Sequence, residues 1–182
     1  MTRAWRVAGV VGLLTLASCS GKGPDDSDIA RGRGLTAASL TPAAEAGVVD
    51  AVVRASFQVE PELVLRAHPR RLPRTAGYEG GDATPTALIG ALRTRGTVRG
   101  TCEPKHEAPR DTPRCSGAET GYVIRVSVPF QAAGDTIQIN FAAEAFGPAT
   151  GARPQALRFE KIYQLVGGGD AWRVVREARV HD

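Results

Sequence analysis

The sequence predicts an α+β fold in which about two helices pack on a curved antiparallel sheet of about four to six strands. Two observations carry this prediction. In two stretches between residues 42 and 94, apolar residues recur at three- and four-residue spacing, as in a helix with one buried face. After Gly96 they recur at every second position, as in half-buried strands. We therefore expect residues 42–182 to form a single domain with helices on one face of the sheet.

Two helices are predicted, and both begin in the same way. Thr41-Pro42 and Thr84-Pro85 each put a threonine at the N-cap and a proline at the first helical position. The first helix is expected to run from residue 42 to about residue 59. The second is expected over residues 85–94 and should end at Gly96, because glycine readily adopts the left-handed conformation that closes a helix.

The strands are predicted from runs of alternating apolar residues that are separated by turns. Short strands are expected near residues 63–67 and 97–103, and longer ones near 122–130, 137–145, 157–165 and 172–180. Gly134-Asp135 and Gly169-Asp170 are turn-forming dipeptides between consecutive long strands. These strands make an antiparallel meander.

The first residues have the composition of an export signal. Arg3 and Arg6 make a positive start, and residues 7–17 carry no charge. Eleven residues are too few to span a bilayer as a helix, which takes about 20, but they fit the apolar region of a secretory signal. The apolar run ends in Leu16-Ala17-Ser18-Cys19.

That tetrapeptide resembles a bacterial lipobox. The resemblance implies that residues 1–18 are a signal peptide, that Cys19 is lipidated, and that residues 19–41 are a flexible tether between lipid and domain. The membrane is then one partner of the chain, and the protein is extracytoplasmic. Ser20, where an aspartate would indicate inner-membrane retention, favours an outer membrane facing the periplasm if the cell has two membranes. An ordinary signal peptide or an uncleaved anchor is the alternative.

The small net charge of the chain does not favour a nucleic-acid partner, and none is expected. The chain has 23 basic and 19 acidic residues, and removal of Arg3 and Arg6 leaves 21 against 19, a net charge near +2. The basic residues are scattered and are not interleaved with aromatic residues. No cofactor motif is present, so no cofactor is expected.

Three cysteines leave one pair after lipidation. Cys102 and Cys115 are expected to form a disulfide, since exported proteins fold in oxidising compartments. A metal site that also uses His106 is an alternative, although it offers three ligands at most. Free thiols are the remaining alternative.

The closing hairpin carries a second resemblance. The pattern Tyr163-x-Leu165, then Gly169-Asp170-x-Trp172-Arg173-Val174-Val175, is similar to the end of SnoaL-like domains of the nuclear-transport-factor-like cone superfamily. The resemblance implies a bent sheet that helices wrap around a conical pocket. The chain departs from that family in lacking a clear third helix, and no catalytic residues of the family map onto it.

A pocket between sheet and helices would be lined by six residues: Tyr122, Phe141, Lys161, Tyr163, Trp172 and Arg176. By strand alternation, Lys161 and Arg176 fall on the apolar face, where a charged group needs a partner. Glu144 or Glu177 could pair with Lys161, or the two cations could bind an anion. A bulge at Glu160-Lys161 would instead turn both cations toward water.

No catalytic set is evident from the sequence. His68 could act as a general base or be a solvated histidine, and solvation is the expectation; His181 lies near the C-terminus. A non-enzymatic role is therefore favoured over an enzymatic one. The expected function is an envelope lipoprotein whose domain is a binding or accessory module for another envelope protein or a small ligand. The alternatives are a cone-fold small-ligand-binding protein or enzyme, and an envelope inhibitor or immunity lipoprotein.

Overall fold

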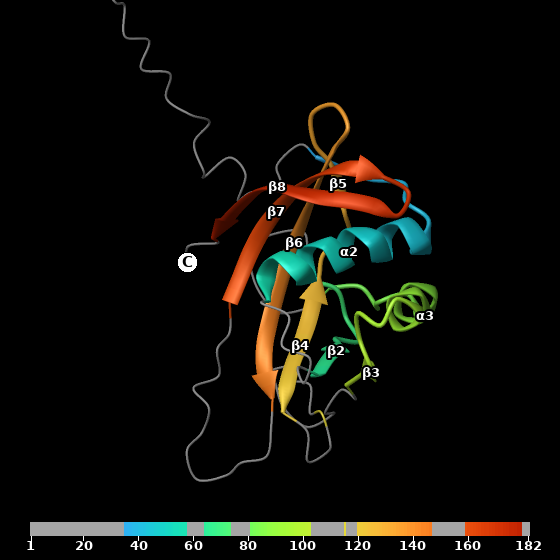
Figure 1. Ribbon diagram of the computed structural model, residues 1–182, viewed down its shortest axis with the longest axis vertical. Coiled ribbons are helices and arrows are strands. Elements are labelled where there is room, and N and C mark those ends of the chain that lie inside the picture. The colour runs from blue at the N-terminus through green and yellow to red at the C-terminus, as the bar shows by residue number, and fades with distance from the viewer. Residues whose placement is uncertain are drawn as a thin grey trace, which may run out of the picture.

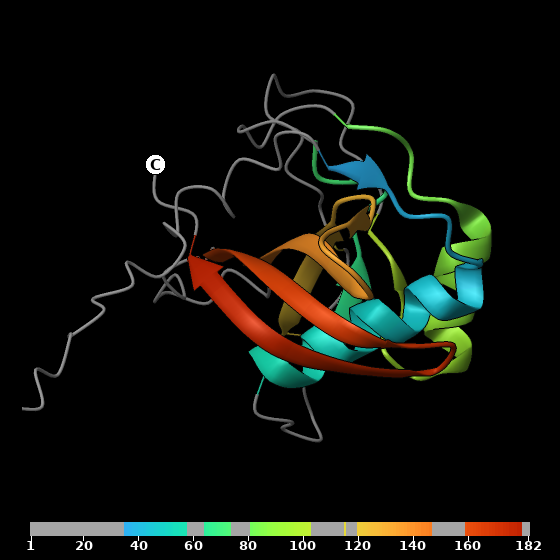
Figure 2. The ribbon, with the colours of Figure 1, turned by 90° about the horizontal axis from the view of Figure 1, so that it is seen from above.

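In the part of the chain that the computed structural model describes, two helices pack on one face of an open, mostly antiparallel sheet of eight strands (Figures 1 and 2), so the predicted α+β class is confirmed. The structure describes residues 35–57, 64–73, 81–102, 115, 120–146 and 159–179. The helices are α2 (Pro42–Ser56) and α3 (Thr86–Thr94). The strands are β1 (Thr36–Ala37), β2 (Val64–Ala67), β3 (Gly100–Thr101), β4 (Gly121–Val126), β5 (Phe130–Gln131), β6 (Thr136–Phe146), β7 (Phe159–Gly168) and β8 (Ala171–Arg179).

The strand count is higher than predicted because β1 and β5, which were not predicted as separate strands, have only two residues each, too few to show an alternating pattern. One of them, β1, pairs with β5 and lies inside the segment predicted as a tether, so that prediction extends too far toward the domain. The long strand β6 pairs with β7 along one edge and with β4 and β5 along the other.

The sheet is mixed, because β2 runs parallel to both β3 and β4. The close approach of β2 and β4 depends on Gly121. A Cβ atom at that position would lie 1.9 Å from the carbonyl oxygen of Val64, so no larger residue fits there without moving the backbone. The sequence prediction of a purely antiparallel sheet is wrong at this edge.

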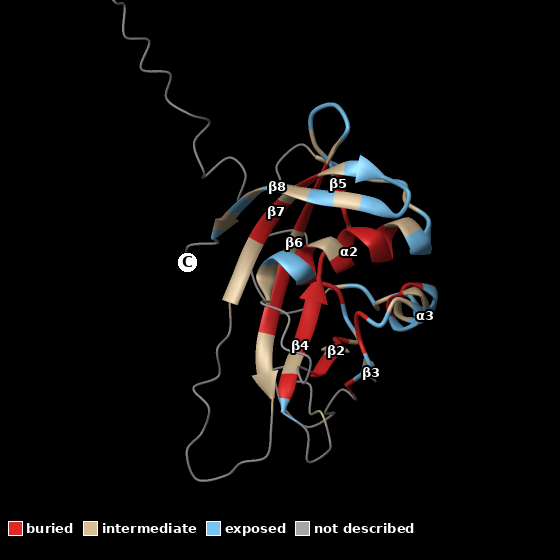
Figure 3. Ribbon diagram, viewed as in Figure 1, coloured by how far each residue is buried: buried red, intermediate tan, exposed pale blue. Residues whose placement is uncertain are grey.

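Helix α2 begins as predicted and ends earlier. The Ala44 amide donates to the Thr41 hydroxyl at 3.2 Å, which confirms the N-cap. Phe57 has an extended backbone and closes the helix three residues before the expected end. The valines Val48, Val49 and Val52 are fully buried in the hydrophobic core. Figure 3 shows the middle of α2 as buried.

Helix α3 begins one residue later than predicted. Pro85 takes the N-cap position, because the Thr84 hydroxyl donates instead to the His68 carbonyl oxygen at 2.9 Å. Gly96 has a φ of 73°, which confirms the predicted left-handed glycine after the helix.

A β-bulge in the β7–β8 hairpin changes which residues face the helices. Leu165 pairs with Val174, but Gln164 pairs with Arg176, so Val175 is the extra residue. Paired residues of antiparallel strands share a face. Val174 therefore faces the helices with the buried Leu165, and Arg176 faces the opposite side with Gln164.

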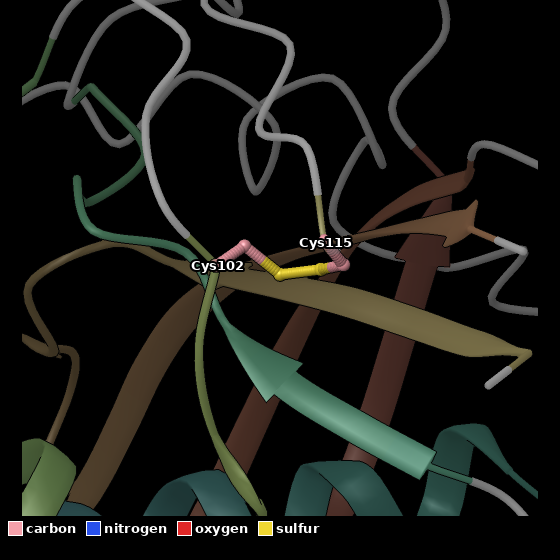
Figure 4. Close-up of a disulfide and its surroundings, with 2 residues drawn as sticks. All are labelled: Cys102 and Cys115. Atoms are coloured by element: carbon pink, nitrogen blue, oxygen red, sulfur yellow. A yellow bond between two sulfur atoms is a disulfide. The ribbon is translucent and has the colours of Figure 1, made fainter. Parts of the chain in front are cut away.

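Cys102 and Cys115 form a disulfide, as predicted, with their Cα atoms 4.8 Å apart (Figure 4). Cys102 directly follows β3, and its amide donates to the Ala67 carbonyl oxygen of β2 at 3.2 Å. The bond therefore ties residue 115 to the parallel edge of the sheet. His106, the third ligand of the alternative metal site, lies outside the described residues.

Candidate functional site

Four of the six predicted pocket residues gather at the C-terminal end of α2. The ring of Phe57 lies 5.0 Å from that of Tyr122 and 6.3 Å from that of Phe141. Phe141 in turn lies 6.1 Å from Tyr163. Phe159 completes this group, 5.9 Å from Phe57. We call these five rings the aromatic cluster; the prediction missed Phe57 and Phe159 as members, although Phe57 ends the apolar stripe of α2.

Lys161 lies at the rim of the aromatic cluster. Its Nζ atom is 5.9 Å from the centroids of both Phe159 and Tyr163, and 3.2 Å from Glu177 Oε1. Glu177 is thus the partner of this lysine, one of the two carboxylates that the sequence offered. The ammonium is held by a carboxylate and two ring faces, so Lys161 lies on the helix-facing side without a bulge at its own position.

Tyr163 joins α2 to β7 through a hydrogen bond. The Ser56 hydroxyl donates its one proton to the Val52 carbonyl oxygen at 2.8 Å, so it accepts from the Tyr163 hydroxyl at 2.7 Å. Burial raises the pKa of the Tyr163 phenol above its ordinary value of 10.0, although the Lys161 ammonium acts in the opposite direction. Tyr163 is therefore a neutral donor near neutral pH and not a base.

The remaining two predicted pocket residues lie apart from the aromatic cluster. Trp172 packs against α2 at Gly47, and its indole nitrogen donates to the Gly169 carbonyl oxygen at 3.0 Å. Arg176 lies on the other face of the sheet beyond the bulge. The prediction placed Arg176 on the wrong face, because the one extra residue at the bulge switches the face of the sheet on which every later residue of β8 lies.

An open cleft of about 460 Å³ lies between parts of α2 and the edge strand β8. We call it the α2–β8 cleft. Its lining residues are Gly47, Asp50, Ala51, Arg54, Ala55, Asp170, Ala171, Trp172, Arg173 and Val174. On α2 the small residues Gly47, Ala51 and Ala55 recur at every fourth position, so they lie in one row along the helix face that borders the cleft.

The two carboxylates of the α2–β8 cleft are already engaged. Asp50 accepts from the Thr97 hydroxyl at 2.9 Å and forms an ion pair with Arg54. Asp170 forms an ion pair with Arg95 of the turn after α3. Both carboxylates that line the cleft therefore already have partners within the protein.

A second opening, of about 340 Å³, lies beside a buried ion pair and is lined partly by Arg71, Asp82 and Phe130. The guanidinium of Arg71 donates to both carboxylate oxygens of Glu45, at 2.5 and 3.1 Å, and to the Ser127 carbonyl oxygen at 3.1 Å. Its donors are directed at partners inside the protein, so this pair fastens α2 to the segment after β2.

The histidines do not form a site in the described part of the chain. His68 is buried, which contradicts the expectation of a solvated side chain, and its Nδ1 atom accepts from the Arg70 amide at 2.9 Å. His181 and Cys19 lie outside the described residues. Among those described, no group of three histidine, cysteine, aspartate or glutamate residues could hold a metal ion.

The chain matches no family model, no curated protein and no solved structure. In the residues that the structure covers, no helix has the length and apolar character to cross a membrane. The resemblance to the cone superfamily stays an expectation from the closing hairpin.

Proposed function

We propose that the chain is a lipoprotein of the bacterial envelope, anchored through Cys19, whose α+β domain binds another envelope protein. The observation that carries the binding role is the α2–β8 cleft beside an edge strand. Within the described residues β8 pairs only with β7, so its second edge offers backbone groups to a partner.

The aromatic cluster supports this role indirectly. Phe141 and Tyr163 are fully buried, and the polar groups around them bind one another. The cluster is therefore a packed part of the core. The α2–β8 cleft, which is open and whose carboxylates already have partners, is the better candidate for an outside ligand.

The anchor is tested with Cys19→Ala. We expect wild-type chain in the membrane fraction, labelled by an exogenous fatty acid, and the variant unlabelled and free of the membrane, since several acyl chains hold a protein far more firmly than one. A variant that stays in the membrane would contradict anchoring through Cys19, and a wild-type chain that takes up no label would contradict lipidation.

The binding role is tested with a photo-cross-linking amino acid at position 55, which lines the cleft. Position 93, exposed on α3 and outside the cleft lining, is the matched control. We expect a discrete cross-linked adduct in cells from position 55 and none from position 93. Adducts from both positions, or from neither, would contradict binding at the cleft.

A further inference from the structure

We infer that the α2–β8 cleft receives an extended acidic segment of a partner protein, which adds as a strand to the edge of β8. This inference rests on the proposed function and specifies the partner. It draws on three observations: the edge of β8, the small residues that face it from α2, and the charge of the strand.

The edge of β8 is accessible where the cleft opens. The bulge at Val175 divides the strand, and the four residues Ala171–Val174 before it line the cleft. Opposite them, α2 presents Ala51 and Ala55, whose small side chains leave space beside the strand, whereas the Trp172 indole already packs on Gly47. An added strand needs such space, because every second side chain points toward α2.

The charge of β8 favours an acidic partner. The strand contains three arginines and one glutamate, and Lys161 already pairs with that glutamate, Glu177. Arg173 and Arg179 are exposed and make no ion pair in the part of the chain that the structure describes. Two copies of β8 would bring like charges together, which disfavours pairing with a second copy.

The two faces of β8 specify an alternating pattern in the partner. Trp172 and Val174 face α2, so partner side chains on that face should be apolar and small enough for the cleft. Arg173, which pairs with Val166, faces the other side. Acidic side chains should therefore occupy the positions between the apolar ones.

The probe is a short capped peptide of alternating valine and glutamate. Binding is followed by the fluorescence of Trp172 in the lipidated chain in detergent, because Trp5, the second tryptophan of the sequence, lies in the signal peptide that lipidation at Cys19 would remove. We expect saturable binding that weakens with salt. The same peptide with lysine for glutamate, or with alternate nitrogens methylated to block strand pairing, should not bind.

Variants locate the peptide. Arg173→Glu should weaken binding about tenfold, because an attraction becomes a repulsion, whereas Arg93→Glu on α3 should leave it unchanged. Ala55→Glu and Ala55→Lys add similar bulk with opposite charge at an exposed position. We expect the glutamate to weaken binding and the lysine to preserve it, with both variants retaining the wild-type circular dichroism spectrum.

Equal binding of the methylated peptide would overturn strand addition, and equal binding by Arg173→Glu would overturn the charge argument. If the protein forms a dimer and the peptide dissociates it, the edge of β8 binds a second copy of the chain. That result would also overturn the inference. If the peptide fails while position 55 still gives its adduct, the acidic strand is wrong and the proposed function stands. If the adduct fails as well, both are wrong.

Discussion

Helix α2 has two sides that differ in how completely they are packed. On the side that faces the core, Val48, Val49 and Val52 are fully buried, and Glu45 forms an ion pair with the buried Arg71. Toward β8, small residues line an open cleft. The same helix thus supplies both the centre of the core and one wall of the candidate binding site.

Side-chain size and the bulge together explain this difference. At the C-terminal end of α2, Phe57 and Tyr163 fill the space between helix and sheet. Toward the N-terminal end Gly47 lets Trp172 approach so closely that an added Cβ atom would lie 3.1 Å from the indole. Beyond the bulge, the charged Glu177 replaces Trp172 and Val174 on the helix-facing side of β8. We call the core-facing side of α2, packed around its valines and Phe57, the closed side, and the side that lines the α2–β8 cleft the open side. The difference between them follows from a few positions in α2 and β8.

Phe141→Ala, on the closed side, should lower the free energy of unfolding more than any other change considered below. The ring is fully buried between Phe57, Phe159 and Tyr163, so its removal leaves a cavity. We expect the free energy of unfolding to fall by about 4 kcal/mol in urea titration. A loss below about 1 kcal/mol would mean that the aromatic cluster is not packed.

Arg71→Met should be nearly as damaging, because it leaves the Glu45 carboxylate buried without its partner. We expect a loss of about 3 kcal/mol in the free energy of unfolding. The double variant Arg71→Met, Glu45→Leu removes both charges and should recover most of this loss. A double variant no more stable than Arg71→Met would contradict the ion-pair explanation.

Local patterns in the sequence predicted the elements of the closed side. The valine stripe of α2, the Thr41 cap and the alternation in β4, β6 and β7 all follow from spacing and were correct. Such patterns are set by neighbours along the chain, so they can be read without knowledge of the fold.

The open side could not be predicted in the same way. Its cleft depends on the distance between α2 and β8, and the bulge at Val175 has no glycine or proline to mark it. The prediction therefore placed Arg176 with Lys161 on one face. Short pairings such as β1 with β5 were missed for a related reason, since two residues carry no period.

Tyr163→Phe should change how the free energy of unfolding depends on pH, because Tyr163 lies on the closed side. Loss of the hydrogen bond to Ser56 should cost about 1 kcal/mol near neutral pH. Because the folded state raises the pKa of this phenol, its contribution is fully present below the ordinary value of 10.0 and is lost as the pH rises above that value. Denaturation from pH 8 to 11 should thus show a steeper decline for wild type than for Tyr163→Phe.

Tyr122→Phe serves as the control for this pH dependence. It removes a phenol from the aromatic cluster while keeping the Tyr163 hydroxyl and its bond to Ser56. In this variant we expect the free energy of unfolding to decline above pH 10 as steeply as in the wild type. Equal slopes for wild type and Tyr163→Phe would contradict the assignment to Tyr163.

Ala55→Gln should have the smallest effect, because residue 55 lies on the open side. The new side chain can extend into the α2–β8 cleft, so the free energy of unfolding should change by no more than about 0.5 kcal/mol. Val52→Gln, on the fully buried side of the same helix, should cost several times more, because it places an amide in the core. If the two variants were equally destabilised in urea, α2 would be packed on both sides and the cleft could not admit a strand.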